Sequence, residues 1–354
     1  ASDPYSINGV SATYMILNRN KRTLPLNLKS PQGIEVAKKV LLDADVILEN
    51  FRPGVLERLG LGYKTICQFN PQIIYGAISG FGRTGPYKER AGFDLIAQGM
   101  SGLMSITGEG GGRPLVKMGA PVTDITAGIL GAMAVAAAYV HKLKTGEGQK
   151  IDTSLFEAGI VHTYWQSAIG LATGVAPGPM GSAHPLNAPY QAFQTEDGWI
   201  TLGAANQKNW LRMLEVIEAP ELAEDDRFKE NTARMSHLQE LENLLTPIFL
   251  KHTTGDWLNR LEAAGVPAGP VLNVNEMHQD PHTLARDMVV DLPHSKLGTV
   301  KSIGLPVKFS ETPGRVVSGA PVYGQHTREV LAEYGYEEEK IDELIAKGAV
   351  AAAD

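Results

Sequence analysis

The first half of the chain alternates short apolar segments with amphipathic ones, and this alternation constrains the fold more than any other feature. Apolar residues at helical spacing, such as Val36, Val40 and Leu41, indicate helices, whereas short apolar runs indicate strands. Because proline fits poorly inside a sheet, Pro25 makes the first strand an edge strand. Strands that alternate with helices predict an α/β fold with a parallel sheet and crossover helices. The expected strands cover 23–28, 45–50 and 73–79, the helices 30–41, 93–105 and 124–143, and single helical turns 55–59 and 63–69.

The second half has the pattern of a smaller α+β unit. The segment 154–173 is predicted as one helix, and the loop 174–181 follows it. A turn at 196–198 lies between two alternating segments and predicts a β-hairpin. The other expected elements are strands 190–195 and 199–204, extended segments near 266–274 and 299–309, and helices 207–217, 234–251, 254–264, 328–334 and 337–347.

Length, charge and cysteine content exclude several classes of protein. A chain of 354 residues suits two domains of about 150 residues each. The net charge is −7 and no long run of Lys and Arg occurs, so we expect no nucleic-acid partner. The single cysteine, Cys67, can form no internal disulfide and is expected to be an inert thiol. This indicates a reducing compartment, the cytoplasm, or the mitochondrial matrix in a eukaryote.

Two further patterns argue against a membrane span and a metal site. The apolar stretch Ile125–Val140 is rich in alanine and glycine and is too short to cross a bilayer, so we expect a buried core helix and no membrane partner. His278, His282 and His294 are irregularly spaced on a polar stretch, so we expect no metal. No Gly-x-Gly-x-x-Gly sequence opens a helix, which argues against the usual nicotinamide site.

Asp124 stands at the start of that apolar stretch and is the strongest catalytic candidate. The N-terminus of a helix offers free N–H groups and a partial positive charge, which favour an ionised carboxylate. A carboxylate held in this way can act as a nucleophile. The alternative is a simple N-cap, which is the usual role of a lone aspartate before an apolar helix.

A set of segments, taken in order along the chain, resembles a known family. The segments are Asn18–Arg22, Leu26–Lys29, Glu49–Gly54, Leu59–Tyr63, Gly80–Pro86, Arg90–Asp94, Lys144–Gln149 and Gly324–Thr327. Through them the chain is similar over nearly its whole length to the class III CoA-transferases, the family of formyl-CoA transferase, carnitine CoA-transferase and α-methylacyl-CoA racemase. It looks most similar to members that move CoA between dicarboxylic acids, such as succinyl-CoA:glutarate transferases.

The resemblance implies a Rossmann-like large domain, a smaller α+β domain and a C-terminal return to the large domain. We expect these parts at residues 1–186, 187–298 and 299–354. The resemblance also implies a dimer of interlocked rings, formed by two identical chains or with a related chain. Family members open with a strand and a helix that supply part of the CoA pocket. Residues 1–10 are polar and loop-like, so this opening is expected to be missing here.

The resemblance assigns acyl-CoA and a small carboxylic acid as substrates and Asp124 as the nucleophile. The aspartate would form a mixed anhydride with the acyl group and then a thioester with CoA. Asp94 aligns with a catalytic glutamate of formyl-CoA transferase. It would orient the nucleophile or shuttle a proton, and the alternative is an N-cap for the helix at 95–105.

The resemblance also places residues along CoA, whose phosphates attract Lys and Arg. Two segments would border CoA, Arg58 would pair with a phosphate, and a third segment would follow the pantetheine arm. For Lys29 and Arg58 the alternative is ordinary surface charge. The expected CoA-binding residues are Leu26, Asn27, Leu28, Lys29, Asn50, Phe51, Arg52, Arg58, Ala91, Gly92 and Phe93.

The loop at 178–181 sits where formyl-CoA transferase has a glycine-rich loop that covers the reaction intermediate. Gly178 and Gly181 would belong to this lid, and a lid that excludes water protects an anhydride from hydrolysis. His184, or a nearby arginine, would hold the carboxylate of the substrate. The alternatives are a plain linker and a structural histidine.

Two other functions stay open at this point. The first is an acyl-CoA racemase or isomerase. Racemases of this family carry a histidine where this chain has Phe93, and phenylalanine cannot take a proton from a C–H bond. The second is a non-catalytic CoA-binding subunit or fragment, because some transferases of this type pair two related chains.

Overall fold

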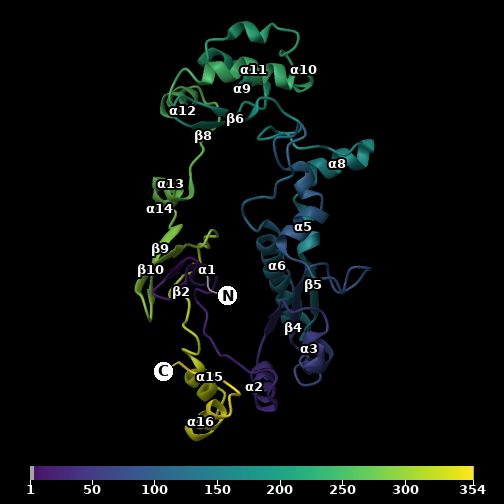
Figure 1. Cartoon of the computed structure of the whole chain (residues 1–354), viewed down its shortest axis with the longest axis vertical. Helices are drawn as coiled ribbons and strands as arrows, with labels where there is room; N and C mark the ends of the chain where they lie inside the picture. Colours follow the sequence, from purple (N-terminus) through teal and green to yellow (C-terminus); the bar gives the residue numbers. More distant parts are fainter. Residues whose placement is uncertain (1–3, 354) are drawn as a thin grey trace. The chain divides into compact units, whose positions relative to one another are not determined.

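A computed structural model describes residues 4–353 of the chain (Figure 1). Strand β4 (Ile74–Ser79) is the central strand of a three-stranded sheet. It pairs in parallel with β3 (Val46–Glu49), and its other neighbour is β5 (Lys150–Ser154). The predicted parallel pairing of β3 with β4 is confirmed. The sequence analysis does not predict β5, because Lys150 and Asp152 interrupt its apolar pattern.

The chain divides into two compact units. The first unit holds the described residues up to Ser79, the segment Gly131–Asp152 and the residues from Asn273 onward. The second unit holds Gly80–Leu130 and Thr153–Leu272. These units do not test the domain boundaries expected at 186/187 and 298/299, which stay predictions.

Three helices of the first unit follow the predicted order. They are α2 (Pro31–Leu42), α3 (Val55–Arg58) and α4 (Tyr63–Ile66). Ser30 occupies the N-cap of α2, but its hydroxyl donates to the Gln32 side chain instead of capping the helix. Buried residues of these helices pack on the central strand in a core that includes Ala37, Leu56, Ile66 and Tyr75.

The predicted edge strand at 23–28 is wrong. This segment makes a single antiparallel bridge, between Leu26 and Val350. The Asn27 N–H donates to the Ala349 carbonyl at 2.9 Å, but Pro25 has no N–H with which to extend a ladder. The segment is therefore tied to the C-terminus of the chain without forming a strand.

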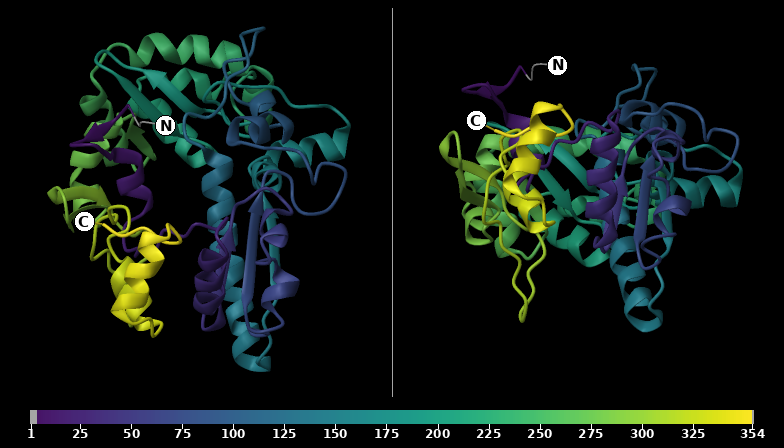
Figure 2. Two further views of the ribbon diagram at one scale, coloured as in Figure 1. Left: turned by 60° about the horizontal axis from the view of Figure 1, so that its bottom comes forward. Right: turned by 90° about the horizontal axis from the view of Figure 1, so that it is seen from below.

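The two ends of the described chain both contribute ordered structure to the first unit. The start is not a simple loop, because β1 (Ser6–Ile7) and β2 (Val10–Ser11) form a short antiparallel pair before α1 (Ala12–Leu17). The closing helices α15 (Thr327–Glu333) and α16 (Glu338–Ala346), yellow in Figure 2, pack through a buried cluster that includes Leu331, Ile341 and Leu344. The remaining elements of this unit are α13 (Val274–Gln279), α14 (Pro281–Ala285) and the antiparallel strands β9 (Val289–His294) and β10 (Gly298–Ile303).

The second unit contains the predicted hairpin. Strands β6 (Tyr190–Gln194) and β7 (Trp199–Gly203) are antiparallel, and β8 (Ala268–Pro270) adds a third strand beside β7. Helices cover this sheet through a core that contains Phe193, Trp210, Phe249 and Trp257. These helices are α9 (Gln207–Val216), η2 (Pro220–Ala223), α10 (Asn231–Ser236), α11 (Leu238–Phe249) and α12 (Thr254–Ala263).

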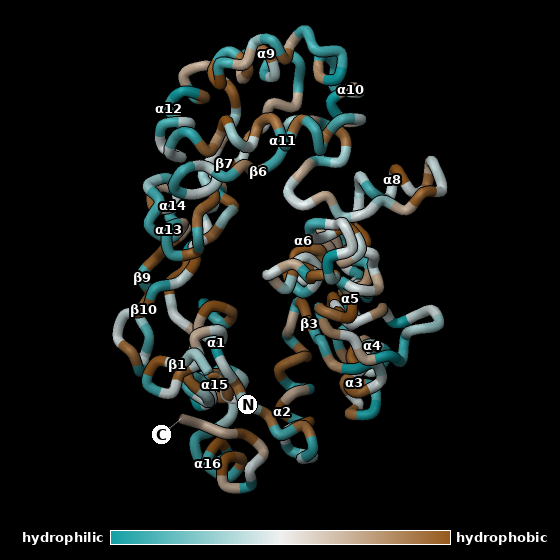
Figure 3. Tube along the Cα trace, turned by 45° about the horizontal axis from the view of Figure 1, so that its top comes forward, coloured by the Kyte–Doolittle hydropathy of each residue, from teal (hydrophilic) through white to brown (hydrophobic). Residues whose placement is uncertain are grey.

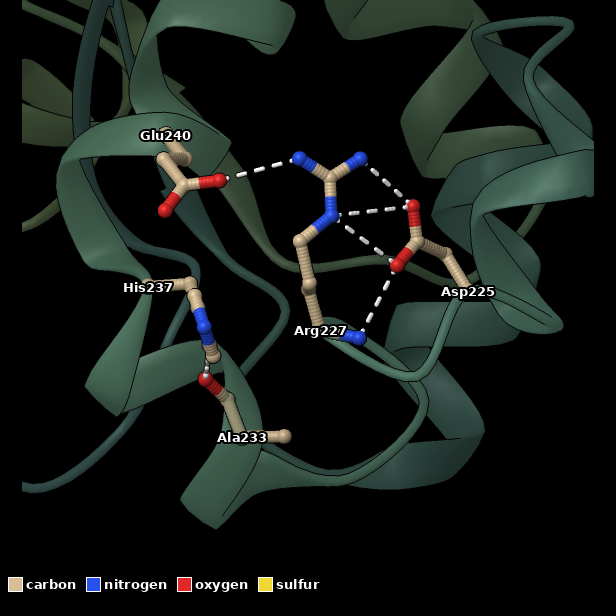
Figure 4. Close-up of polar contacts among 5 residues, drawn as sticks. All are labelled: Asp225, Arg227, Ala233, His237 and Glu240. Carbon is tan, nitrogen blue, oxygen red and sulfur yellow. Dashed lines mark hydrogen bonds and ion pairs between the residues drawn. The ribbon is translucent and has the colours of Figure 1, made fainter.

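An arginine ties the segment before α10 to helix α11 (Figure 4). Arg227 donates through Nη2 to Asp225 at 2.7 Å and through Nη1 to Glu240 at 2.9 Å. Its guanidinium also lies 4.8 Å from the centre of the Phe228 ring. The helix predicted at 234–251 is broken nearby, because His237 leaves helical geometry and ends α10 just before α11 begins.

The helix predicted at 154–173 is also two helices. Helix α7 (Leu155–Val161) ends before His162, and α8 (Tyr164–Thr173) begins after Thr163. The Thr163 hydroxyl donates to the Ile160 carbonyl at 2.8 Å, which closes the turn locally instead of continuing the helix. Apolar residues recur along α8 (Figure 3), yet none of its residues is buried.

Helix α6 (Val122–Thr145) corrects two predictions. It has 24 residues, and by length and composition it is apolar enough to cross a membrane. Only 22% of its most apolar window is buried in this chain, so the predictions of a short segment and of a buried core helix are wrong. Ile129 and Met133 are 64% and 62% exposed. The absence of a membrane partner stays a prediction.

Helix α7 packs closely on α5 (Asp94–Met100) and on the start of α6, and a glycine permits this approach. A Cβ atom added to Gly159 would lie 2.7 Å from Ser101 Cβ and 3.3 Å from Thr123 Cγ2. Both neighbours are fixed close to their backbones. Only a residue without a side chain fits at this position.

We therefore expect Gly159→Ala to lower the free energy of unfolding by about 1–3 kcal/mol, because overpacking outweighs the helix propensity that alanine adds. Gly255, inside α12, has open space around the position of a Cβ atom. Gly255→Ala is thus the matched control, and it should stabilise the chain by up to about 1 kcal/mol. Urea denaturation of both variants measures the difference. Equal effects at the two glycines would show that the close packing of α7 is not a constraint.

Candidate active site

Asp124 lies in the first turn of α6, with its helix starting two residues earlier at Val122. It is therefore inside the helix, and the alternative of an N-cap for Asp124 is wrong. The early start follows from Pro121, whose carbonyl accepts the Ile125 N–H at 3.1 Å and closes the first helical turn. The first turn places Asp124 where unpaired N–H groups carry partial positive charge.

Asp94 caps α6 from a different helix. The N–H and the hydroxyl of Thr123 both donate to Asp94 Oδ1, at 3.0 and 2.8 Å. Asp94 is the first residue of α5, and the N-cap position of α5 belongs to Phe93. The alternative that Asp94 caps its own helix is therefore wrong, because its carboxylate serves the helix that carries Asp124.

Gln98 binds the second carboxylate oxygen of Asp94, and it is not among the residues predicted from the sequence. Its Nε2 donates to Asp94 Oδ2 at 2.8 Å, and its Oε1 accepts the Met118 N–H at 2.9 Å. Gln98 and Thr123 are both fully buried. The spacing of four residues between Asp94 and Gln98 places both side chains on one face of α5, which is the signal that could have found this pair.

The Asp124 carboxylate is free of such partners. Among residues 4–353 no donor hydrogen-bonds to it, and the residue as a whole is exposed. The atoms around the carboxyl group nevertheless exclude part of its water, and this burial raises the pKa of Asp124. The negative charge of Asp94 raises the pKa further. Both carboxylate oxygens of Asp94 thus accept hydrogen bonds, whereas within residues 4–353 those of Asp124 accept none.

The segment that leads to Asp94 is held by packing of backbone on backbone. A Cβ atom on Gly80 would lie 2.8 Å from Gly92 Cα, so neither glycine tolerates a side chain there. Within the loop between them, the Arg90 guanidinium lies 4.7 Å from the centre of the Tyr87 ring. Ala91 and Phe93 flank this contact, and Phe93 is 75% exposed. The loop therefore presents Phe93 to solvent directly before Asp94.

The other predicted CoA residues belong to the first unit. Leu26, Asn27, Leu28 and Lys29 precede α2, where a Cβ on Gly33 would lie 2.2 Å from the Asn27 carbonyl oxygen. Asn50, Phe51 and Arg52 follow β3, at the carboxyl end of a parallel strand, where ligands bind in such sheets. Arg58 ends α3.

The charged members of this group are available for a ligand. Lys29, Arg52 and Arg58 are exposed, and within residues 4–353 none of them forms an ion pair. Asn50 Nδ2 donates to the Ile78 carbonyl at 3.0 Å, which fixes the turn after β3 to the end of β4. Surface charge without a partner agrees with a phosphate site and equally with ordinary solvated charge, so these assignments stay predictions.

The predicted substrate residues lie in the second unit with the two aspartates. Gly178 is exposed in an irregular segment, and the Gly181 N–H donates to the Gly108 carbonyl at 2.8 Å. His184 stacks on Tyr190, with ring centres 5.1 Å apart, and meets the edge of Trp165. Its Nδ1 accepts the Leu186 N–H at 3.1 Å. In the neutral ring the proton is then on Nε2, which can donate to a ligand.

A pocket of about 480 Å³ adjoins this loop. Met180, Gly181 and Ser182 line one side, and Gln239 and Glu242 of α11 line the other.

The part of the chain that the structure describes contains no group of three or more His, Cys, Asp or Glu side chains placed to hold a metal ion. Cys67 is partly buried at the end of α4.

The structure therefore brings together Asp94, Asp124, the segment 91–93 and the loop 178–184 within one unit. It places the segments 26–29 and 50–52, together with Arg58, in the other. The residues that sequence reasoning misses are Gln98 and Thr123, which hold Asp94, and Gly159, which lets α7 approach them.

Comparisons with known proteins bear on the family and the fold. Residues 2–327 match the family described as CoA-transferase family III. The succinate–glutarate CoA-transferase of Agrobacterium fabrum is 38% identical over 323 residues, 91% of this chain and 80% of that protein. The human succinyl-CoA:glutarate CoA-transferase is 35% identical over 348 residues, 98% and 79% of the two chains. A crystal structure of a CaiB/BaiF family protein from Brucella suis is 35% identical with a TM-score of 0.82, covering 93% and 86%. The mixed α/β fold is thereby confirmed.

The raised pKa of Asp124 predicts a pH-dependent cost in stability. The folded chain binds the Asp124 proton more tightly than the unfolded chain does, where the pKa is about 3.9. Stability is therefore lost as the pH rises from that value through the raised pKa. We expect Asp124→Asn to unfold at a higher urea concentration than the parent chain at pH 7. This gain should vanish below the pKa of the unfolded chain, where the Asp124 carboxyl is protonated in both the folded and the unfolded parent chain.

Asp197 provides the control of opposite sign. Its pKa is lowered, first by the Thr254 N–H and then by the Thr254 hydroxyl. We expect Asp197→Asn to destabilise the chain at pH 7, with the difference shrinking as the pH falls through the lowered pKa. The midpoints of urea denaturation of both variants, measured from pH 7 down through the acidic range, distinguish the two effects. A loss of stability in Asp124→Asn at pH 7 would contradict the assigned environment.

Proposed function

The chain belongs to family III of the CoA-transferases, so it moves CoA from a thioester to a free carboxylic acid, and on that premise we propose that Asp124 is its nucleophile. The observation that carries the proposal is the contrast between two neighbouring aspartates. Asp94 has its oxygens occupied by Thr123 and Gln98, whereas the Asp124 carboxylate accepts no hydrogen bond within the described residues. Of the two, Asp124 is the group free to attack.

The proposed reaction exchanges acyl groups through the Asp124 carboxylate. An oxygen of Asp124 attacks the thioester carbonyl, the C–S bond breaks, and the sulfur leaves as a thiolate with the electron pair. The thiolate attacks the aspartyl carbonyl of the mixed anhydride and releases the first acid as a carboxylate. The second acid attacks the resulting aspartyl thioester, which forms a second mixed anhydride and releases the thiolate. The thiolate then attacks the acyl carbonyl of the second acid, and the bond between that carbonyl carbon and the Asp124 oxygen breaks. Asp124 is regenerated, and no other energy source is needed.

The environment of Asp124 suits this role. Burial and the charge of Asp94 raise the pKa of Asp124, and a more basic carboxylate is a stronger nucleophile. The first turn of α6 also carries partial positive charge close to the reacting carbonyl, where negative charge develops. In this proposal Asp94 orients the first turn of α6, because one of its oxygens is bonded to Thr123 and the other to Gln98.

The proposed CoA residues supply positive charge and an apolar path. Lys29, Arg52 and Arg58 would bind the phosphates, since they are exposed and lack ion-pair partners in the described chain. Leu26, Asn27, Leu28, Asn50 and Phe51 would border the nucleotide. Ala91, Gly92 and Phe93 would follow the pantetheine arm toward Asp94.

We propose dicarboxylic acids as the acids exchanged. Two relatives are named as transferases that act on succinate or succinyl-CoA and glutarate. His184 supports the proposal, because its ring is fixed by Tyr190 and Leu186 and leaves Nε2 to bind a carboxylate. Gly178 and Gly181 would belong to a lid that excludes water from the anhydride. Phe93 weighs against a racemase, since it has no group that could take a proton.

We also propose that the chain works as a homodimer in the cytoplasm. The support for the dimer is α6, whose apolar side chains Ile129, Met133 and Leu143 are exposed in the single chain. Large exposed apolar surfaces in proteins are usually covered by a partner. A related but different chain is the alternative partner.

The nucleophile is tested by trapping the aspartyl-CoA thioester. The chain is incubated with succinyl-CoA and its intact mass is measured, followed by borohydride reduction and peptide mapping. We expect an added mass of one CoA and reduction at Asp124. Asp124→Ala should form no adduct. Asp124→Asn should also form none, except in molecules in which the asparagine has deamidated to aspartate.

Asp197→Asn is the matched control, because it removes a carboxylate that caps α12 outside the proposed site. It should form the adduct at the rate of the parent chain. An adduct at another residue, or none with succinyl-CoA and a panel of other acyl-CoAs in a chain that binds CoA, would refute the assignment of Asp124.

The dimer is tested by sedimentation equilibrium. We expect twice the mass of one chain for the parent protein, and a shift to single chains for Met133→Glu, because a charge buried in an apolar interface is costly. Leu211→Glu is the control, since Leu211 is partly exposed on α9 and outside α6. A parent chain that stays single on its own but associates with a related chain would favour the heteromer.

A further inference from the structure

Gln98 joins three parts of the second unit: helix α5, the segment before α6 and the first turn of α6. Its amide donates to Asp94 on its own helix and accepts the N–H of Met118 in the segment before α6. Asp94 in turn accepts both donors of Thr123, the residue next to Asp124. A continuous set of hydrogen bonds therefore runs from Met118 through Gln98 and Asp94 to the first turn of α6.

Each member of this set has a fixed orientation. Gln98 and Thr123 are fully buried, so water cannot replace the bonds that they make. Gln98 uses its donor on one side and its acceptor on the other, which fixes the orientation of the amide. The Asp94 carboxylate has one oxygen on Thr123 and the other on Gln98, so it cannot rotate without breaking a bond at each end.

We propose that Gln98 is a positioning residue for the transferase reaction, which holds the Asp94 carboxylate on Thr123 and so fixes Asp124 toward its substrate. This inference rests on the proposed function of Asp124. Gln98 itself is buried and contacts no substrate. It acts through Asp94, and its contact with Met118 additionally fixes the segment that enters α6.

The surroundings allow a substitution that discriminates this role from a merely structural one. The titratable groups near Gln98 are Asp94 on α5, Asp124 on α6 and Lys117 in the preceding segment, where Lys117 Nζ donates to the Met118 carbonyl. On α7, which packs on α5, the titratable side chain is Glu157, and it is bonded to Ser154. Gln98→Glu therefore places a new carboxyl directly against Asp94.

The new carboxyl can replace the amide only while it is protonated. In that form it donates to Asp94 Oδ2 and accepts from Met118, as glutamine does. When it ionises, it loses the donor and repels Asp94. A role in positioning thus predicts that the Gln98→Glu variant approaches the parent rate at acidic pH and falls away from it as the pH rises. A loss that depended only on packing would not follow pH.

The test is the single-turnover rate of CoA-adduct formation with succinyl-CoA, measured by quenched-flow mass spectrometry over a range of pH. We expect Gln98→Leu to be slower than the parent chain by about 10- to 100-fold at every pH, because misplacement of a reacting group by about 1 Å has effects of this size. Gln98→Glu should show the same loss at high pH and recover at low pH. Ser101→Ala is the control: it removes a hydroxyl that donates to the main-chain carbonyl of Gln98 at 3.4 Å but leaves the bonds of the Gln98 side chain in place, so it should react at the parent rate.

Two outcomes would overturn the proposal. One is a parent-like rate for Gln98→Leu, and the other is a ratio of Gln98→Glu to parent that does not change with pH. Hydrogen exchange at the Thr123 amide is followed in the same variants and should quicken in Gln98→Leu. Exchange that quickens at Thr123 but not at the paired amides of β6 and β7 shows the loss of the bonds that join Gln98, Asp94 and Thr123, whereas general unfolding quickens both. This readout needs no adduct from succinyl-CoA. Absence of an adduct in the parent chain would instead refute the role of Asp124.

Discussion

The pair of hydrogen bonds from Thr123 to Asp94 is the contact on which the candidate site depends. It brings a second carboxylate next to Asp124, although two like charges at close range repel each other. The repulsion is offset because Asp94 satisfies free donors at the start of α6 and receives a third bond from Gln98. One carboxylate is thus stabilised by the protein, and the second is left with a raised pKa and no partner in the described chain.

This arrangement requires backbones to approach more closely than side chains allow. Gly159 lets α7 lie against Ser101 and Thr123, and Gly80 and Gly92 touch at the turn that leads to Asp94. In each case an added Cβ atom would lie 3.3 Å or less from a neighbouring atom that is held near its backbone. The positions of the two aspartates therefore depend on glycines, which carry no functional group. This supports the view that packing positions a reactive group.

The sequence predicts local features of this molecule better than long-range ones. The alternation of strands and helices, the hairpin at 196–198 and the candidate Asp124 all depend on nearby residues, and the structure contains the corresponding elements. The cap that Asp94 supplies to α6 joins residues 29 positions apart, so no local pattern shows it. The helices predicted at 154–173 and 234–251 fail for a related reason, because threonine and histidine at the breaks are compatible with a helix by propensity alone.

Helix α6 shows why hydropathy alone cannot assign the surroundings of an apolar helix. A buried core helix, a membrane span and a helix covered by a partner chain share the same composition, and only 22% of this helix's most apolar window is buried. Its ends discriminate among these settings. The first turn carries Asp124 and is bonded to Asp94, and near the last turn Lys142 pairs with Asp45 at 2.8 Å. Both ends are thus anchored by charged groups of the same chain, while the apolar residues between them stay uncovered. This combination agrees with the proposal that a partner chain covers these apolar residues, since large exposed apolar surfaces in proteins are usually covered by a partner.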